Sequence, residues 1–247
     1  MNNTINLENA HHVTLPNGLC AMLCHTPEAS ESFVSMAVRA GHFYDPNDCQ
    51  GLAHLLEHML FMGSRHLPKP NAINGFIEQH GGTINAWTGT EYANYHFSCS
   101  GGALAQTLPA FADMLRQPLF EEDALTNEIK NIHAEFEFKK KDDLRRLYQI
   151  HKETCNPHHP FAKFSVGNSD TFSQHECAEL KHRLKSLHQT YYCALNMRLC
   201  IASPMPTPQL EALIHQCFGS LPSGELAPDN WPCLLYTSDA ADDLTRV

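Results

Sequence analysis

Apolar and polar residues alternate along several stretches of the chain, which is the pattern of half-buried β-strands. In one of them Val34, Met36 and Val38 alternate with small or polar residues, so this strand is expected to bury one face. The expected strands fall within residues 11–25, where two strands flank a Pro-Asn-Gly turn, and within residues 32–41, 83–100 and 196–204.

Apolar residues three and four positions apart predict helices in most of the remaining chain. The expected helices cover residues 51–64, 71–82, 103–120, 121–153, 180–192 and 207–218. Residues 121–153 are expected to form one long helix, and Thr207 is expected to cap the last one, with Pro208 at its first position. Strands in hairpins combined with segregated helices predict an α+β fold, with a mostly antiparallel sheet flanked by helices.

One folded domain is expected over residues 1–232. Its last part, residues 222–232, is rich in proline and polar residues and resembles a linker. Residues 233–247, CLLYTSDAADDLTRV, continue none of the patterns above. We expect them to be an unrelated tail, of the kind that a truncation or a sequencing artefact leaves.

The composition, 43% hydrophobic and 18% charged, is that of an ordinary soluble globular protein. A formal net charge of −10 argues against nucleic acid or an anionic membrane surface as a partner. The chain has no run of apolar residues long enough to predict a membrane span, and its first residues lack the features of a signal peptide. The ten cysteines include no C-x-x-C pair, so reduced thiols and a cytoplasmic location are expected.

Residues 51–64, GLAHLLEHMLFMGS, place three polar side chains in an otherwise apolar helix. Helical spacing collects His54, Glu57 and His58 on one face and the leucines and Met59 on the opposite, core-facing side. Two histidines at positions i and i+4 can both direct a ring nitrogen at one zinc ion, and Glu57 would lie close to a water bound there. This order, H-x-x-E-H, is the inverted form of the H-E-x-x-H zinc-protease motif.

The chain has 17 histidines, so the motif alone could be a coincidence on a solvated helix face. A catalytic zinc normally has a third protein ligand, and the candidates lie in residues 127–140. Glu128 and Glu135 share one stripe of the expected long helix with Ile132. Periodicity does not choose between the two glutamates, and both could equally be exposed salt-bridging residues.

Five stretches together resemble the pitrilysin and insulin-degrading enzyme family of inverzincin zinc metallopeptidases, in the order found in that family. The resemblance covers roughly residues 15–221 and implies a fold of the pitrilysin and processing-peptidase type. The stretches are GLAHLLEHMLFMGS, HGGTINAWTGTEYANYHF, NEIKNIHAEFEFKK, NPHHPFAKFSVGN and LHQTYYCALNMRLCIAS.

The resemblance implies that Glu135 is the third ligand, so that His54, His58 and Glu135 hold Zn²⁺. It implies that Glu128 supports the site from behind these ligands. Glu57 is expected to take a proton from the zinc-bound water and pass it to the leaving amine. The strand around Asn85 and Ala86 is expected to be an edge that pairs with an extended peptide substrate.

These expectations amount to a zinc-dependent endopeptidase domain that hydrolyses oligopeptides or small polypeptides. Family members are longer, so the expected partners are a peptide substrate and the missing C-terminal domains or a partner subunit. The alternatives are a non-catalytic interaction subunit or inactive truncated fragment of the same fold, and an unrelated metal-binding protein. His158 and His159, in the Pro-rich loop, are expected to pack in that loop and not to form a second metal site.

Overall fold

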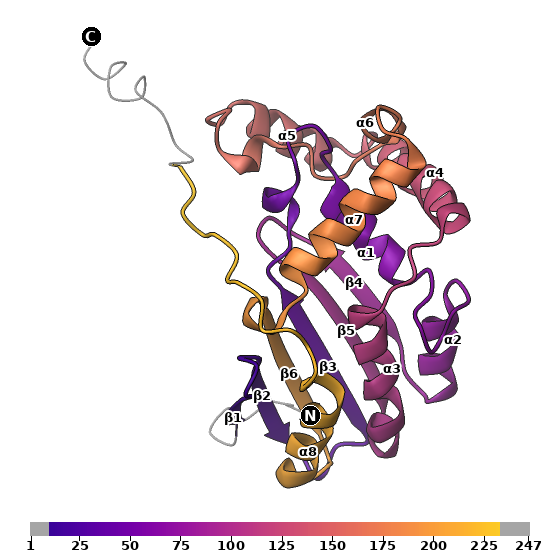
Figure 1. Ribbon diagram of the computed structural model, residues 1–247, viewed down its shortest axis with the longest axis vertical. Helices are drawn as coiled ribbons and strands as arrows, with labels where there is room; N and C mark the ends of the chain where they lie inside the picture. Colours follow the sequence, from indigo (N-terminus) through magenta and orange to yellow (C-terminus); the bar gives the residue numbers. More distant parts are fainter. Residues whose placement is uncertain (1–9, 233–247) are drawn as a thin grey trace, which may run out of the picture.

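The computed structural model describes residues 10–232, which form a six-stranded sheet with helices on one face (Figure 1). The predicted tail, residues 233–247, lies outside the described residues, so that expectation stays a prediction. The strands are β1 (Ala10–Thr14), β2 (Cys20–His25), β3 (Glu31–Val38), β4 (Ile84–Thr88), β5 (Ala93–Ser100) and β6 (Met197–Ser203).

The sheet has the strand order β1-β2-β6-β3-β5-β4, so β1 and β4 are its edges. All neighbouring strands pair antiparallel except β2 and β6, which run parallel. The expected alternation of β3 is confirmed, because Val34, Met36 and Val38 are buried. The prediction of an α+β fold with a mostly antiparallel sheet is therefore confirmed.

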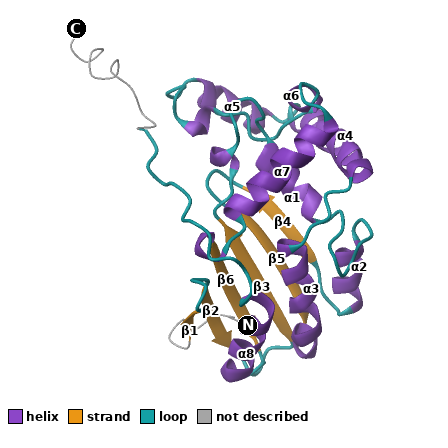
Figure 2. Ribbon diagram, in the orientation of Figure 1, coloured by secondary structure: helices purple, strands orange, loops and turns teal. Residues whose placement is uncertain are grey.

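Helices cover one face of the sheet and gather at one of its ends (Figure 2). In Figure 1, α3 and α7 cross in front of the sheet, and α1, α4, α5 and α6 lie around its upper end. The helices are α1 (Leu52–Leu60), α2 (Ala72–Gln79), α3 (Leu104–Arg116), α4 (Glu122–Lys139), α5 (Asp143–Glu153), α6 (Ser169–Phe172), α7 (Cys177–Tyr191) and α8 (Thr207–Phe218). A short 3₁₀ helix, η2 (His42–Tyr44), precedes α1.

The single long helix expected over residues 121–153 is wrong, because the chain breaks between α4 and α5. Asp142 causes the new start: its side chain accepts the backbone N–H of Arg145 at 2.9 Å and caps α5. The expected Thr207 cap is also wrong. Pro206 occupies the capping position, and Thr207 is the first residue of α8.

Residues 222–232 are packed against the body of the protein, although they contain no helix or strand. The hydroxyl of Tyr44 donates to the carbonyl of Pro228 at 3.0 Å, and Trp231 packs edge-on against Phe43. Ala227 is buried in the same small apolar cluster. The segment that resembled a linker therefore contributes to the folded unit.

No helix within residues 10–232 combines the length and apolarity needed to cross a membrane.

Candidate metal centre and active site

The position of α1 is fixed at its first turn by a buried aspartate. Asp45 accepts the backbone N–H groups of Gly51 and Ala53 at 2.8 and 2.7 Å, so its carboxylate satisfies two of the free donors of the helix. Gly51 has a φ of 90°, and a Cβ atom there would lie 2.4 Å from the Cα of Gly167. Only glycine fits this turn, which holds the start of α1 against the loop before α6.

The two faces of α1 are those that the sequence predicts. Leu52, Leu55, Leu56 and Met59 are buried in the core. The other face carries the motif residues, all partly buried, and the helix packs against α4, α7 and β4.

His54, His58 and Glu135 converge on one point. Oε2 of Glu135 lies 3.6 Å from Nε2 of His54 and 3.5 Å from Nε2 of His58. Three ligands about 2.1 Å from a tetrahedral zinc ion would be separated by about 3.4 Å, so these side chains fit such an ion. Within residues 10–232 this is the one group of three or more His, Cys, Asp or Glu side chains close enough together to hold a metal ion.

Hydrogen bonds on the far side of each imidazole orient both rings. Nδ1 of His54 lies 2.7 Å from the carbonyl of Val166, and Nδ1 of His58 lies 2.9 Å from Oε2 of Glu128. Both partners are acceptors, so each Nδ1 carries the proton and donates. In the neutral form of each ring, Nε2 then has a free lone pair directed at the side of Glu135.

The structure distinguishes the two glutamates that spacing left equivalent. Glu135 faces Nε2 of both histidines, whereas Glu128 reaches one of the two rings, that of His58, at Nδ1 and lies behind it. Glu128 is 6% exposed and also accepts a hydrogen bond from Nδ2 of Asn131 at 2.9 Å. Its position is suited to orienting a ligand and not to joining the three-residue group.

Burial and nearby charges shift the pKa values of the three ligand candidates in different directions. Burial, aided by the nearby His58, lowers the pKa of His54 to about 4, which keeps this ring neutral. Burial opposes the charged form of His58, but hydrogen bonds with Glu128 and Glu135 outweigh it and raise the pKa of His58 to about 9. The hydrogen bond from His58 lowers the pKa of Glu135 to about 2, and Lys139 also pairs with this carboxylate.

Glu57 lies on the same face of α1 and is held by Thr88 at the end of β4. The hydroxyl of Thr88 donates to Oε2 of Glu57. Burial raises the pKa of Glu57, and the hydrogen bond from Thr88 opposes that shift. A carboxylate that is partly desolvated and held beside a group of candidate metal ligands is a suitable proton acceptor.

The strand expected to bind substrate, β4, is an edge of the sheet and pairs only with β5. Thr83 and Gly89 bond through their backbones to the β5 side, at Ser98 and Tyr92. Because backbone direction alternates in an antiparallel pair, the backbone groups of Ala86 point to the free edge and those of Asn85 point to β5. The side chain of Asn85 accepts the N–H of Ala86 at 2.8 Å.

Four residues that shape the site were missed by the sequence analysis: Asp45, Thr88, Lys139 and Val166. Lys139 is four positions from Glu135 on α4, a spacing that could have indicated the ion pair. Thr88 and Val166 reach α1 from other parts of the fold, and Val166 acts through a backbone carbonyl that has no sequence signature. Asp45 lies six and eight positions before the N–H groups that it accepts. His159, by contrast, is buried against Phe43, which agrees with packing in the loop, whereas His158 is exposed and does not pack there.

A helix that carries H-x-x-E-H is the signature of the inverzincin class of metallopeptidases, and in this fold a carboxylate from a second helix faces it. The sequence profile of the insulinase family, peptidase family M16, matches residues 21–162. The chain belongs to this family.

Similar proteins include two peptidases from distant organisms. Insulin-degrading enzyme of Bos taurus is 33% identical over 221 residues, which cover 88% of this chain and 22% of that protein. Protease 3 of Escherichia coli (strain K12) is 33% identical over 213 residues, which cover 86% of this chain and 22% of that protein. The chain thus spans about a fifth of the length of these relatives.

The fold is also that of a solved structure. The crystal structure of pitrilysin superposes with a TM-score of 0.84 at 30% sequence identity, covering 95% of this chain and 26% of that one. The predicted family resemblance is confirmed.

Proposed function

We propose that this chain is the catalytic domain of a zinc-dependent endopeptidase, with the domain spanning residues 1–232. The observation that carries the proposal is the convergence of Nε2 of His54, Nε2 of His58 and Oε2 of Glu135, at 3.5–3.6 Å from the carboxylate to each ring. Membership of a peptidase family supports the reaction class.

His54, His58 and Glu135 would hold the metal, and their imidazole and carboxylate donors suit Zn²⁺. Bound zinc would lower the pKa of a coordinated water toward about 7 and polarise the scissile carbonyl. Glu57 takes a proton from the attacking water and returns it to the leaving amine. Acid–base assistance of this kind is typically worth about 10²–10⁴ in rate.

Glu128 and Thr88 keep these groups in place. Glu128 accepts the Nδ1 proton of His58, which leaves Nε2 of that ring available to the metal. Thr88 holds Oε2 of Glu57, so that the other carboxylate oxygen can face the reacting groups.

The substrate is an oligopeptide or small polypeptide bound along β4. Ala86 offers its backbone groups at the free edge of the sheet, where an extended peptide can add as a further strand. Asn85 supports this edge through its side chain. Further domains or a partner subunit would complete the enclosure of the substrate, because the related peptidases are several times longer.

We place the protein in the cytoplasm. All nine cysteines within residues 10–232 are free thiols, as in proteins of a reducing compartment.

The test combines metal content with cleavage of a quenched fluorescent peptide. We expect about one zinc per chain, loss of the metal with a chelator, and chelator-sensitive cleavage that returns when zinc is restored. Replacing His54 and His58 by alanine should abolish zinc binding in a chain that still folds by circular dichroism. Wild-type zinc content in that double variant would exclude the proposed site. Cleavage by this chain alone is expected to be weak, because it spans about a fifth of the length of the related peptidases. Zinc binding without cleavage of any peptide would favour a non-catalytic subunit or an inactive fragment.

A further inference from the structure

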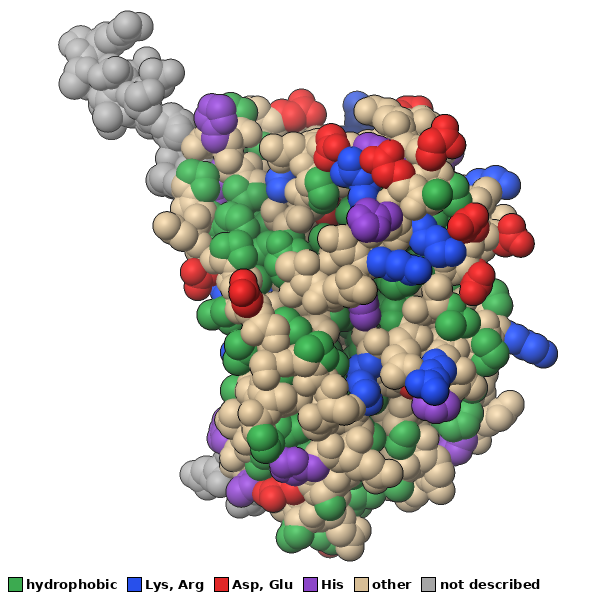
Figure 3. Space-filling view, viewed as in Figure 1, with side chains coloured by type: hydrophobic (Ala, Val, Ile, Leu, Met, Phe, Trp, Pro, Cys, Tyr) green, Lys and Arg blue, Asp and Glu red, His purple; other side chains and the backbone are tan. Residues whose placement is uncertain are grey.

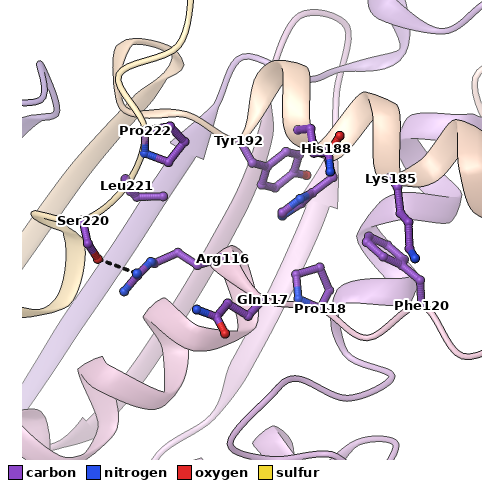
Figure 4. Close-up of a pocket in the computed structure, with 11 residues that line it drawn as sticks. Arg116, Gln117, Pro118, Phe120, Lys185, His188, Tyr192, Ser220, Leu221 and Pro222 are labelled. Carbon is purple, nitrogen blue, oxygen red and sulfur yellow. Dashed lines mark hydrogen bonds between the residues drawn. The ribbon is translucent and has the colours of Figure 1, made fainter.

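A cavity of about 580 Å³ opens between the end of α3, the last turns of α7 and the segment after α8 (Figure 4). It shares no lining residue with the candidate active site. Its walls come from residues 116–120, from residues 185–192 and from residues 220–222. A cavity of this volume is large enough for a small organic ligand.

The lining of this cavity is basic. It contains Arg116 and Lys185 but no aspartate or glutamate, in a chain whose formal net charge is −10. Figure 3 shows basic and histidine side chains around the hollow in the middle of this face, with the acidic side chains mostly above it. The local charge is thus opposite in sign to that of the whole protein.

The two cations differ in how they are held. Nη1 of Arg116 donates to the carbonyl of Cys217 at 2.8 Å, and Nη2 donates to Oγ of Ser220 at 2.5 Å. These bonds fix the plane of the guanidinium group, which has further N–H donors to offer. Lys185 forms no ion pair with any residue in the described part of the chain, and its ammonium group is free to meet an incoming anion.

The rest of the wall combines three ring side chains with two glutamines, a serine and aliphatic residues. The rings of His188 and Tyr192 stack with centroids 4.8 Å apart, and Phe120 packs edge-on against His188. Nε2 of His188 donates to the carbonyl of Leu115 at 2.8 Å, and burial lowers the pKa of this ring. His188 therefore belongs to a neutral aromatic surface beside the two cations.

We propose that this cavity, the α3–α7 pocket, binds a small organic anion: a carboxylate or phosphate carried on a flat apolar group. Arg116 and Lys185 bind the anionic oxygens, because a guanidinium group and an ammonium group are the usual partners of such oxygens. His188, which is partly exposed, contacts the apolar group, and the nearly buried Phe120 and Tyr192 support its ring. This proposal does not depend on the metal centre or on peptidase activity.

The experiment measures binding of defined probes to the metal-free chain by titration calorimetry and by thermal shift. The probes are phenyl phosphate and benzoate, with inorganic phosphate and benzyl alcohol as the charged and the apolar halves alone. We expect phenyl phosphate or benzoate to bind at least about tenfold more tightly than either half, and more weakly as ionic strength rises. Equal binding of benzyl alcohol would refute the role of the cations, and equal binding of inorganic phosphate would refute that of the aromatic wall.

Lys185→Gln locates the binding site without removing a contact that the fold uses. It should weaken binding of the better probe by about fivefold to tenfold, the loss expected for one charged partner. Lys69→Gln, which removes the same charge from an exposed residue outside the pocket, is the matched control and should leave binding unchanged. Equal affinities in wild type and Lys185→Gln would overturn the assignment, as would failure of every probe to bind.

Discussion

Glu128 accepts the Nδ1 hydrogen of His58 at 2.9 Å, from a side chain that is almost fully buried. The bond joins α4 to the motif helix and fixes both the tautomer and the rotation of the ring. A buried carboxylate in this position also makes the imidazole a stronger base and hence a better metal ligand.

Replacing Glu128 by alanine is therefore expected to weaken zinc binding by about tenfold to a hundredfold, because His58 loses its orienting partner. The measurement is competition with a chromophoric chelator. Glu137→Ala is the matched control, since Glu137 lies on the same helix and, in the described part of the chain, its one ion pair is with Lys140. Unchanged zinc affinity in Glu128→Ala would show that the bond has no part in metal binding.

Glu57→Gln should keep zinc content at the wild-type value and reduce the peptidase rate by at least about a hundredfold, because an amide cannot take the proton. Peptide cleavage is compared at equal zinc occupancy, with the exposed Glu78→Gln as control. A rate close to wild type would remove Glu57 from the mechanism.

Thr88→Val removes the hydroxyl that holds Glu57 while keeping the shape of the side chain. We expect kcat to fall by about tenfold with KM and zinc content unchanged, as for the loss of one hydrogen bond to a charged group. Thr88→Ser keeps the donor and should stay within about threefold of wild type. A serine variant as impaired as the valine variant would point to packing and not to the hydrogen bond.

The buried His42 should make stability depend on pH. Its Nδ1 donates to the carbonyl of Gly89 at 2.9 Å, while its buried Nε2 has no hydrogen-bond partner among residues 10–232. Burial, with a smaller effect of the Lys152 charge, lowers the pKa of His42 to about 4, below its unfolded value of about 6.5. The unfolded chain then binds more protons between these values, so this contribution to stability is complete above pH 6.5 and is lost toward pH 4.

The loss would be on the order of 3 kcal/mol, measured as the difference in free energy of unfolding between wild type and His42→Asn from pH 7 to pH 4. Asparagine can still donate to Gly89 but does not titrate, so the two stabilities should converge as the pH falls. The exposed His182→Asn should follow wild type throughout. Parallel curves for His42→Asn and wild type would contradict the assigned pKa.

The pattern of apolar and polar residues was sufficient to predict features that depend on residues close together in the sequence. The two faces of α1 follow from helical spacing, and the alternation of β3 follows from the pleat of a half-buried strand. The choice between Glu128 and Glu135 did not follow, because both lie on one stripe of α4 and only the approach of α1 distinguishes them.

Other features depended on contacts that a periodic pattern does not contain. The break before α5 depends on a single capping carboxylate, that of Asp142, inside a stretch of otherwise good helix formers. Asp45 caps α1 from six and eight positions away, outside the usual capping distance, and Thr88 reaches Glu57 from a different strand.

The close approach of Gly51 to Gly167 has a consequence for protein engineering. The loop that contains Val166 presents its carbonyl to His54. The close approach of the two glycines packs this loop against the first residues of the motif helix, so helix and loop keep a fixed relative position. A five-residue H-x-x-E-H sequence transplanted onto another helix would bring the imidazoles but neither of the acceptors that orient them. Transfer of the proposed metal site to a new scaffold therefore requires three separate segments of chain: the helix, the glycine-containing loop and the glutamate-bearing face of α4.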